Sequence, residues 1–264
     1  FAPGLSNVTL GQAIRQVQAE NAVARVGGIP NHESAARHPL QYMITWSFEH
    51  VLREYMVDVR IIEAGRLAEV KATSGRESFR FSECGVDEML ECAITPGMPS
   101  FLFTRSHLQS FAEKTIRWPG HWQAIDILKD CGLMDIEPIS FCGQEVRPRD
   151  FFLKIIEPRL VPQPGDMDVC VMWNTAWGAK ARSDCYMWAE GDAQSGLSAM
   201  ARVTASCAAV AARLLAGREI KEKGIVAPED AIKGEVYASL MKELEKRGIA
   251  VVEKMAGIED QSRS

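Results

Sequence analysis

Two stretches of this sequence have the pattern of adjacent antiparallel strands, and they restrict the fold more than any other feature. Residues 57–72 hold two apolar or β-branched runs around a glycine-containing turn at 63–65, and residues 167–178 and 180–191 repeat this arrangement around 178–179. Helical patterns occur between and around them, at 9–20, 121–132, 148–160, 198–216 and 235–248. This order predicts an α+β domain with a mixed or antiparallel sheet and flanking helices, not a doubly wound parallel sheet.

The remaining segments give weaker signals. Residues 21–30 favour a short strand that Gly27 and Gly28 break and Pro30 ends. The patterns predict a strand at 77–83, a helix at 86–93, an extended segment at 100–104 and a final strand at 249–255. The helix at 198–216 is rich in small residues, so we expect it to be buried in a contact with another domain or subunit.

The overall composition argues against several classes of function. The net charge is −5, whereas nucleic-acid binding normally needs a basic surface. The sequence contains no run of 18 apolar residues, so it does not predict a membrane-spanning helix. The seven cysteines are odd in number and lack C-x-x-C spacing, which favours free thiols in a reducing compartment and therefore a cytoplasmic protein.

Motifs for nucleotides, metals and hydrolysis are absent from the sequence. It has no G-x-G-x-x-G, no G-x-x-x-x-G-K-[ST], no H-E-x-x-H and no G-x-S-x-G. Gly27 and Gly28 precede a proline, so they offer no helix N-terminus to a phosphate. The residues alone therefore predict an α+β domain whose ligand is a small acid, with no metal site.

Residues 114–121, KTIRWPGH, bring a cation, an aromatic ring, a tight turn and a histidine together. Arg117 is either an ordinary surface arginine or a carboxylate clamp, because a guanidinium group can bind a carboxylate through two parallel hydrogen bonds. His121 either caps the following helix or acts as a general base, since the pKa of histidine lies near neutrality.

Six fragments of the sequence occur in a familiar order. They are FAPGLSN, RVGGIP, HPLQYMITWS, KTIRWPGH, SAMARVTA and GIVAPE, the last followed by a helix and RGI. In this order the chain resembles the saccharopine dehydrogenase and lysine 6-dehydrogenase family over nearly its whole length. It is similar to the C-terminal part of that family, which binds the substrate and forms the dimer contact, without most of the N-terminal Rossmann domain.

The resemblance implies an enzyme organised in two parts. A Rossmann half would bind NAD or NADP, and we expect no cofactor and no activity in this chain alone. Residues 1–20 would continue from the dinucleotide-binding domain, 21–197 would form the substrate-binding domain, and 198–264 would pack on the Rossmann half. The expected reaction is oxidoreduction at the C–N bond of lysine or a lysine conjugate, in a homodimer.

The resemblance also implies a set of site residues. Arg117 would bind a substrate carboxylate, and Trp46 or Tyr42 would cover the aliphatic chain of the substrate. His121, from its own chemistry, is the candidate catalytic base. Gly27 and Gly28 would shape the pocket wall. The further substrate contacts considered are Val26, Asn174 and Thr204, with structural hydrogen bonds as the default for the last two.

Val26 departs from the family pattern. Saccharopine-forming members have a cysteine there that faces the substrate, so valine favours the lysine dehydrogenase branch. Two alternatives remain open. One is a polyamine enzyme similar to carboxyspermidine dehydrogenase, and the other is a non-catalytic oligomerisation module.

Overall fold

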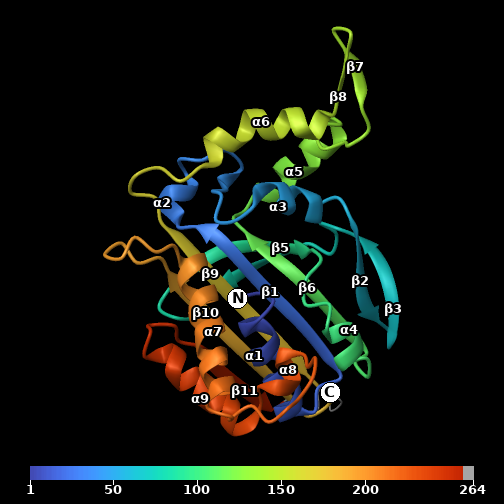
Figure 1. The fold of residues 1–264 in the computed structure, drawn as a ribbon. Coiled ribbons are helices and arrows are strands. Elements are labelled where there is room, and N and C mark those ends of the chain that lie inside the picture. Colours follow the sequence, from blue (N-terminus) through green and yellow to red (C-terminus); the bar gives the residue numbers. More distant parts are fainter. Residues whose placement is uncertain (258–264) are drawn as a thin grey trace, which may run out of the picture.

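The computed structural model describes residues 1–257 and is built around one curved sheet (Figure 1). The strand order is β11-β10-β9-β1-β6-β2-β3, and the β4–β5 hairpin joins the sheet through β6. β1 and β6 pair in parallel, and the other pairs among the described strands are antiparallel. The predicted α+β fold with a mixed sheet and flanking helices is confirmed.

The strands are β1 (Asn21–Pro30), β2 (Asp58–Glu63), β3 (Arg66–Lys71), β4 (Glu77–Phe81), β5 (Glu88–Ile94), β6 (Ser110–Arg117), β7 (Ile139–Phe141), β8 (Gln144–Val146), β9 (Asp168–Trp177), β10 (Ala181–Glu190) and β11 (Val252–Gly257). The helices are α1 (Leu5–Val17), α2 (His32–Ala35), α3 (Phe48–Glu54), α4 (Phe101–Thr104), α5 (His121–Asp130), α6 (Pro148–Leu160), α7 (Ala199–Ala216), α8 (Pro228–Ala231) and α9 (Gly234–Glu245), with a 3-10 turn at Pro39–Gln41. Both hairpins predicted from alternation are present, as β2–β3 and β9–β10.

The two faces of β9 are buried under different elements, because successive side chains of a strand point to opposite faces. Cys170 and Met172 belong to a core cluster with Val203 and Val210 of α7. On the opposite face, Val169 and Val171 pack with Phe81 and Leu90 of the β4–β5 hairpin. The sheet therefore curls, so that its β4–β5 end covers the face that α1 and α7 leave open (Figure 1).

Helix α1 begins four residues earlier than the sequence predicts. Gly4 has φ 135°, a conformation that favours glycine, and its N–H donates to the Asn7 side chain. Thr9, the first residue of the predicted helix, lies inside α1 and donates its hydroxyl to the carbonyl oxygen of Leu5 at 2.9 Å. The helix is buried along most of its length against β9 and β10.

Three local predictions are wrong. Residues 86–93, expected to be helical, contribute to strand β5, in which Leu90 and Cys92 are buried. Residues 101–104, expected to be extended, form the short helix α4. Gly27 and Gly28 do not break their strand, since β1 pairs with β9 continuously from Asn21 to Pro30.

Helix α7 is only partly buried. Val203, Val210 and Leu214 enter the core, while the small side chains on its other face are exposed, so the contact expected there is not made within residues 1–257. By length and composition alone α7 could also cross a membrane. It carries Arg202 and Arg213, and it packs on β9 and α9. The last residues of the predicted C-terminal segment, 258–264, lie outside the described part.

A projecting arm extends from the top of the molecule in Figure 1. It consists of α5, the β7–β8 hairpin and α6. Several large apolar side chains of the arm are exposed, among them Ile139, Phe141, Phe151 and Ile155.

We expect Gly27→Ala to destabilise the fold. A Cβ atom at this position would lie 2.7 Å from the carbonyl oxygen and 2.9 Å from the Cβ of Ile116 on the paired strand β6. Such a backbone clash typically lowers the free energy of unfolding by about 1–3 kcal/mol. Urea denaturation measures the change. Gly257→Ala, where nothing lies within 4 Å, is the control, and equal stability of the two variants would contradict the prediction.

Candidate functional site

A cavity of about 430 Å³ opens between the chain's first residues, β1, the end of α3, β6 and the first turns of α7. It is lined by Phe1, Ala2, Pro3, Val26, Gly27, Gly28, Trp46, Glu54, Pro96, Gly97, Glu113, Thr115, Arg117, Met200 and Thr204. Six of the residues predicted from the sequence are thus brought together: Arg117, Trp46, Val26, Gly27, Gly28 and Thr204.

The parallel pairing of β1 with β6 forms the floor of the cavity. Val26 lies opposite Thr115 in the register, and Arg117 follows two residues later at the end of β6. A Cβ atom on Gly28 would meet the end of Met200 at 2.3 Å and the Thr45 hydroxyl at 3.2 Å. Gly27 is therefore required for the close approach of the β6 backbone, as strand glycines often are, whereas at Gly28 the contact is with the flexible end of Met200.

Arg117 is held rigidly although it makes no ion pair within residues 1–257. Its Nε donates to the Tyr55 hydroxyl at 3.0 Å, and its Nη1 donates to the Ile116 carbonyl at 2.9 Å. The guanidinium group lies 5.2 Å from the centre of the Tyr42 ring. Arg117 is 4% exposed, and its Nη2 has no hydrogen-bond partner among the described residues, so one edge remains available to an anion.

Two aromatic residues predicted to cover the substrate have different positions. Trp46 lines the cavity and is 40% exposed, so it can close over a ligand from the rim. Tyr42 is fully buried beneath Arg117 and does not line the cavity. Burial raises the pKa of Tyr42, and its ring acts as a support for the guanidinium group.

His121 lies behind the cavity wall and does not line it. Its Nδ1 contacts the Leu40 carbonyl at 2.9 Å, and its Nε2 contacts the Tyr55 hydroxyl at 3.3 Å. Burial, followed by the charge of Arg117, lowers the pKa of His121 to about 3. A neutral ring that donates to Leu40 and accepts from Tyr55 satisfies both contacts, and leaves the Tyr55 oxygen to accept from Arg117. This position supports Arg117 through Tyr55 and does not favour proton exchange with a ligand.

Asn174 and Thr204, the two secondary candidates, are separated by the structure. Asn174 is fully buried and donates to the Ser6 carbonyl at 3.0 Å and to the Thr9 hydroxyl at 2.9 Å, so it ties β9 to α1. Thr204 lines the cavity, where its hydroxyl accepts a hydrogen bond from the Phe1 amine at 2.9 Å. Only Thr204 is placed to reach a ligand.

Sequence reasoning missed two carboxyl groups in the cavity, Glu54 and Glu113. Burial raises the pKa of Glu54 to about 7. Burial and the nearby Glu54 raise the pKa of Glu113 to about 8. One signal was present in the sequence, because Glu113, Thr115 and Arg117 alternate along one strand and therefore share a face.

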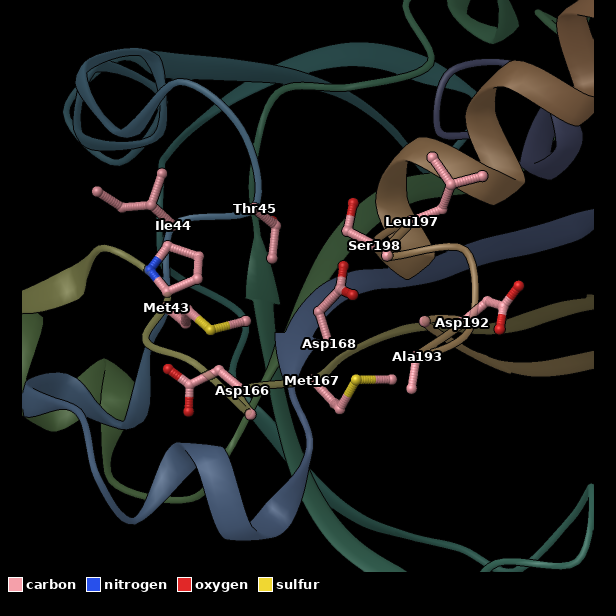
Figure 2. A pocket seen from close by; sticks show the side chains of 14 residues that line it. Met43, Ile44, Thr45, Asp166, Met167, Asp168, Asp192, Ala193, Leu197 and Ser198 are labelled. Atoms are coloured by element: carbon pink, nitrogen blue, oxygen red, sulfur yellow. The ribbon is translucent and has the colours of Figure 1, made fainter.

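A second cavity of about 510 Å³ lies beside the start of α7 (Figure 2). Asp168 stands at its centre and accepts from the backbone N–H groups of Ala199 at 2.6 Å and Met200 at 3.0 Å. Asp166 is bound by Arg37 and His38. The carboxylates of this cavity therefore already serve to cap a helix and anchor a loop, which makes the first cavity the better candidate.

Among the described residues the structure shows no metal-ligand cluster, and the Gly27-Gly28 pair does not form a dinucleotide-type turn. Within residues 1–257 no group of three His, Cys, Asp or Glu side chains could hold a metal ion, and the seven cysteines are free. The Gly27-Gly28 pair lies inside a continuous strand that leads through Pro30 into a helix of four residues. This differs from the glycine-rich turn before a long helix that cradles a dinucleotide phosphate.

We expect the ring of His121 to remain neutral throughout the range of pH 5–8. NMR titration of its ring protons should show no transition in this range, in which free histidine titrates. Because the folded-state pKa lies below the unfolded value of about 6.5, the unfolded state binds more protons between these two values. His121 therefore lowers stability as pH falls from about 6.5 toward 3. A transition of the His121 signals near pH 6.5 in the folded protein would contradict this prediction.

Asn174→Ala should reduce stability without changing ligand affinity. Loss of its two buried hydrogen bonds is expected to lower the free energy of unfolding by about 1–3 kcal/mol. Urea denaturation and calorimetric titration measure the two quantities, with the exposed Gln144→Ala as control. If Asn174→Ala loses ligand affinity while its stability is unchanged, Asn174 contacts the ligand and the structural role is wrong.

Comparisons with known proteins agree with the observed architecture. The family model described as saccharopine dehydrogenase C-terminal domain matches residues 1–249. Among solved structures, the chain is similar to apo histidine-tagged saccharopine dehydrogenase (L-Glu forming) from Saccharomyces cerevisiae, with a TM-score of 0.76 and 18% identity over 96% of this chain and 72% of the yeast chain. At this identity the yeast structure supports the fold alone. The match over residues 1–249 shows that the chain belongs to the saccharopine dehydrogenase C-terminal domain family.

Proposed function

We propose that this chain forms the substrate-binding part of an NAD(P)-dependent oxidoreductase that acts on the C–N bond of lysine or a lysine conjugate. The observation that carries the proposal is the fixed guanidinium group of Arg117. It faces the cavity and makes no ion pair with any of the described residues. Family membership supplies the reaction class, and the cavity supplies the substrate class.

A buried arginine with a free edge favours an anionic ligand of planar geometry. Its side chain is already ordered by Tyr55 and the backbone of β6, so little conformational entropy is lost when a carboxylate binds. A carboxylate also compensates a positive charge that otherwise has no ion-pair partner in the described residues. A substrate carboxylate is the simplest group with both properties.

The apolar part of the cavity suits the hydrocarbon portion of such a substrate. Val26 and Met200 line the wall, and Trp46 lies at the rim. Burial of substrate methylenes against these side chains contributes about 0.8 kcal/mol for each methylene group. Because Val26 offers no polar contact, we favour lysine over saccharopine as the substrate, although the yeast relative is a saccharopine dehydrogenase.

The cofactor site is proposed to lie in a nucleotide-binding part outside this chain, because Gly27 and Gly28 lie inside a continuous strand and not in a dinucleotide-type turn. When bound there, a nicotinamide would accept a hydride from the carbon that bears the nitrogen. The contribution of this chain is to orient the substrate and to exclude water around it. On this proposal the chain alone turns over no substrate.

An oligomerisation module is the second candidate, and a specific observation favours it. The projecting arm exposes Phe141 and Phe151, which are 62% and 56% accessible, and exposed apolar groups of this kind often mark protein contacts. A homodimer formed through the arm is compatible with either function. Ligand binding in the Arg117 cavity separates the two proposals, because an oligomerisation module has no need of it.

We expect Arg117→Ala to weaken binding of L-lysine to this chain by about tenfold or more, because a charge-assisted hydrogen-bonded contact is lost. Isothermal titration calorimetry measures the dissociation constant. In the enzyme that carries this chain, the same substitution should raise KM. Arg53→Ala, at an exposed position on the neighbouring helix α3, is the matched control. Equal affinity of wild type and Arg117→Ala would remove the carboxylate assignment.

A further inference from the structure

The cavity that contains Arg117 also holds two carboxyl groups that the proposed function leaves unused. Glu113 is 7% exposed, and its Oε2 is buried without a hydrogen-bond partner among the described residues. Glu54 lines the same cavity from the end of α3 and makes no ion pair within residues 1–257. A buried acceptor without a partner is costly, so a ligand group that donates to it would reduce that cost.

Gly97 makes room for the Glu113 carboxyl group at the cavity wall. A Cβ atom added to Gly97 would lie 1.8 Å from Oε2 of Glu113, so the glycine leaves the space that this carboxyl group occupies. Gly97 does not have a positive φ, and the reason for a glycine here is therefore room and not backbone conformation. Gly97 and Glu113 both line the cavity, so the carboxyl group is held at its wall.

The strand geometry separates this carboxyl group from the arginine. Glu113 and Arg117 are four residues apart on β6, which corresponds to about 13 Å along the strand between their Cα atoms. The α-ammonium of an amino acid is adjacent to its carboxylate and cannot bridge such a separation. An ammonium at the far end of an extended aliphatic side chain suits it better.

We propose that Glu54 and Glu113 form a carboxyl pair that binds the side-chain ammonium of the substrate whose carboxylate contacts Arg117. The pair and the arginine would then recognise the two ends of one ligand, a long α-amino acid with a terminal primary amine. This inference rests on the proposed function, since Arg117 must hold the carboxylate. It assigns the specificity of the cavity to two residues beyond the arginine.

The protonation of the pair gives the inference a pH dependence. The charged groups facing the pair are Arg117 on β6 and the α-amino group of Phe1, whose pKa is lowered by burial. Burial raises the pKa values of Glu54 and Glu113 to about 7 and about 8. Below pH 7 both carboxyl groups are largely protonated and attract an ammonium weakly. As pH rises toward 9 both ionise while the lysine ammonium remains charged, so binding becomes tighter.

The test compares L-lysine with L-norleucine, which lacks only the side-chain amine, by calorimetric titration of this chain. At pH 8.5 we expect lysine to bind about tenfold or more tightly than norleucine, because the charged contact to a carboxylate is added. This preference should shrink as pH falls to 6. In Glu113→Gln the preference should largely disappear, while norleucine affinity stays within about twofold of wild type. Glu49→Gln, at an exposed position on α3, is the control and should retain the preference.

Gly97→Ala provides a second variant that keeps both charges. The clash falls on the end of a flexible side chain, so the Glu113 carboxyl group should move at little cost to stability. We expect this variant to unfold at a similar urea concentration and to lose the preference for lysine.

The outcomes separate this inference from the proposed function. If norleucine binds through Arg117 and lysine binds no more tightly, the carboxyl pair is overturned and the carboxylate site stands. If Glu113→Gln retains the preference at every pH, the pair is also overturned. If neither ligand binds wild type, the proposed function fails together with this inference.

Discussion

The parallel pairing of β1 with β6 is the constraint on which the rest of the cavity depends. It places Val26 beside Thr115 and carries Arg117 to the end of the strand, next to the first turn of α5. The pairing tolerates no side chain at Gly27, because Ile116 occupies that space. The pairing of the two backbones therefore sets the positions of Glu113 and Arg117, the charged residues of β6 that line the cavity.

Burial of Arg117 is made acceptable by its surroundings. Desolvation of a cation is costly, and here it is offset by the Tyr55 hydroxyl, by backbone carbonyls and by the face of the Tyr42 ring. These partners are neutral, so they hold the guanidinium group without cancelling its charge. The cation stays in place and remains electrostatically available, which is the arrangement that recognition of an anion requires.

The sequence predicted the elements whose signals are local. Alternation revealed the two hairpins, and helical periodicity revealed α5, α6, α7 and α9. It failed for β5, because Leu90 and Cys92 are buried in a cluster with residues of β1 and β9, which are distant in sequence. The start of α1 depends on a turn at Gly4 that the helical pattern does not contain.

The candidate site was predicted only in part, because the sequence does not show which distant residues meet in the fold. The order of six sequence fragments identified Arg117 and Trp46 as residues of one cavity. Glu54 and Glu113 were missed because a carboxylate in a sequence normally indicates a solvated surface, and only the tertiary structure shows that these two are enclosed. His121, predicted to be the catalytic base, contacts Tyr55 next to the site but does not line the cavity.

The Tyr55 hydroxyl connects the cavity with helix α5 of the projecting arm. His121 is the first residue of α5, the first helix of the projecting arm, and its ring contacts the same Tyr55 hydroxyl that accepts the Nε–H of Arg117. One hydroxyl group, that of Tyr55, therefore joins the first residue of α5 to the cation of the cavity.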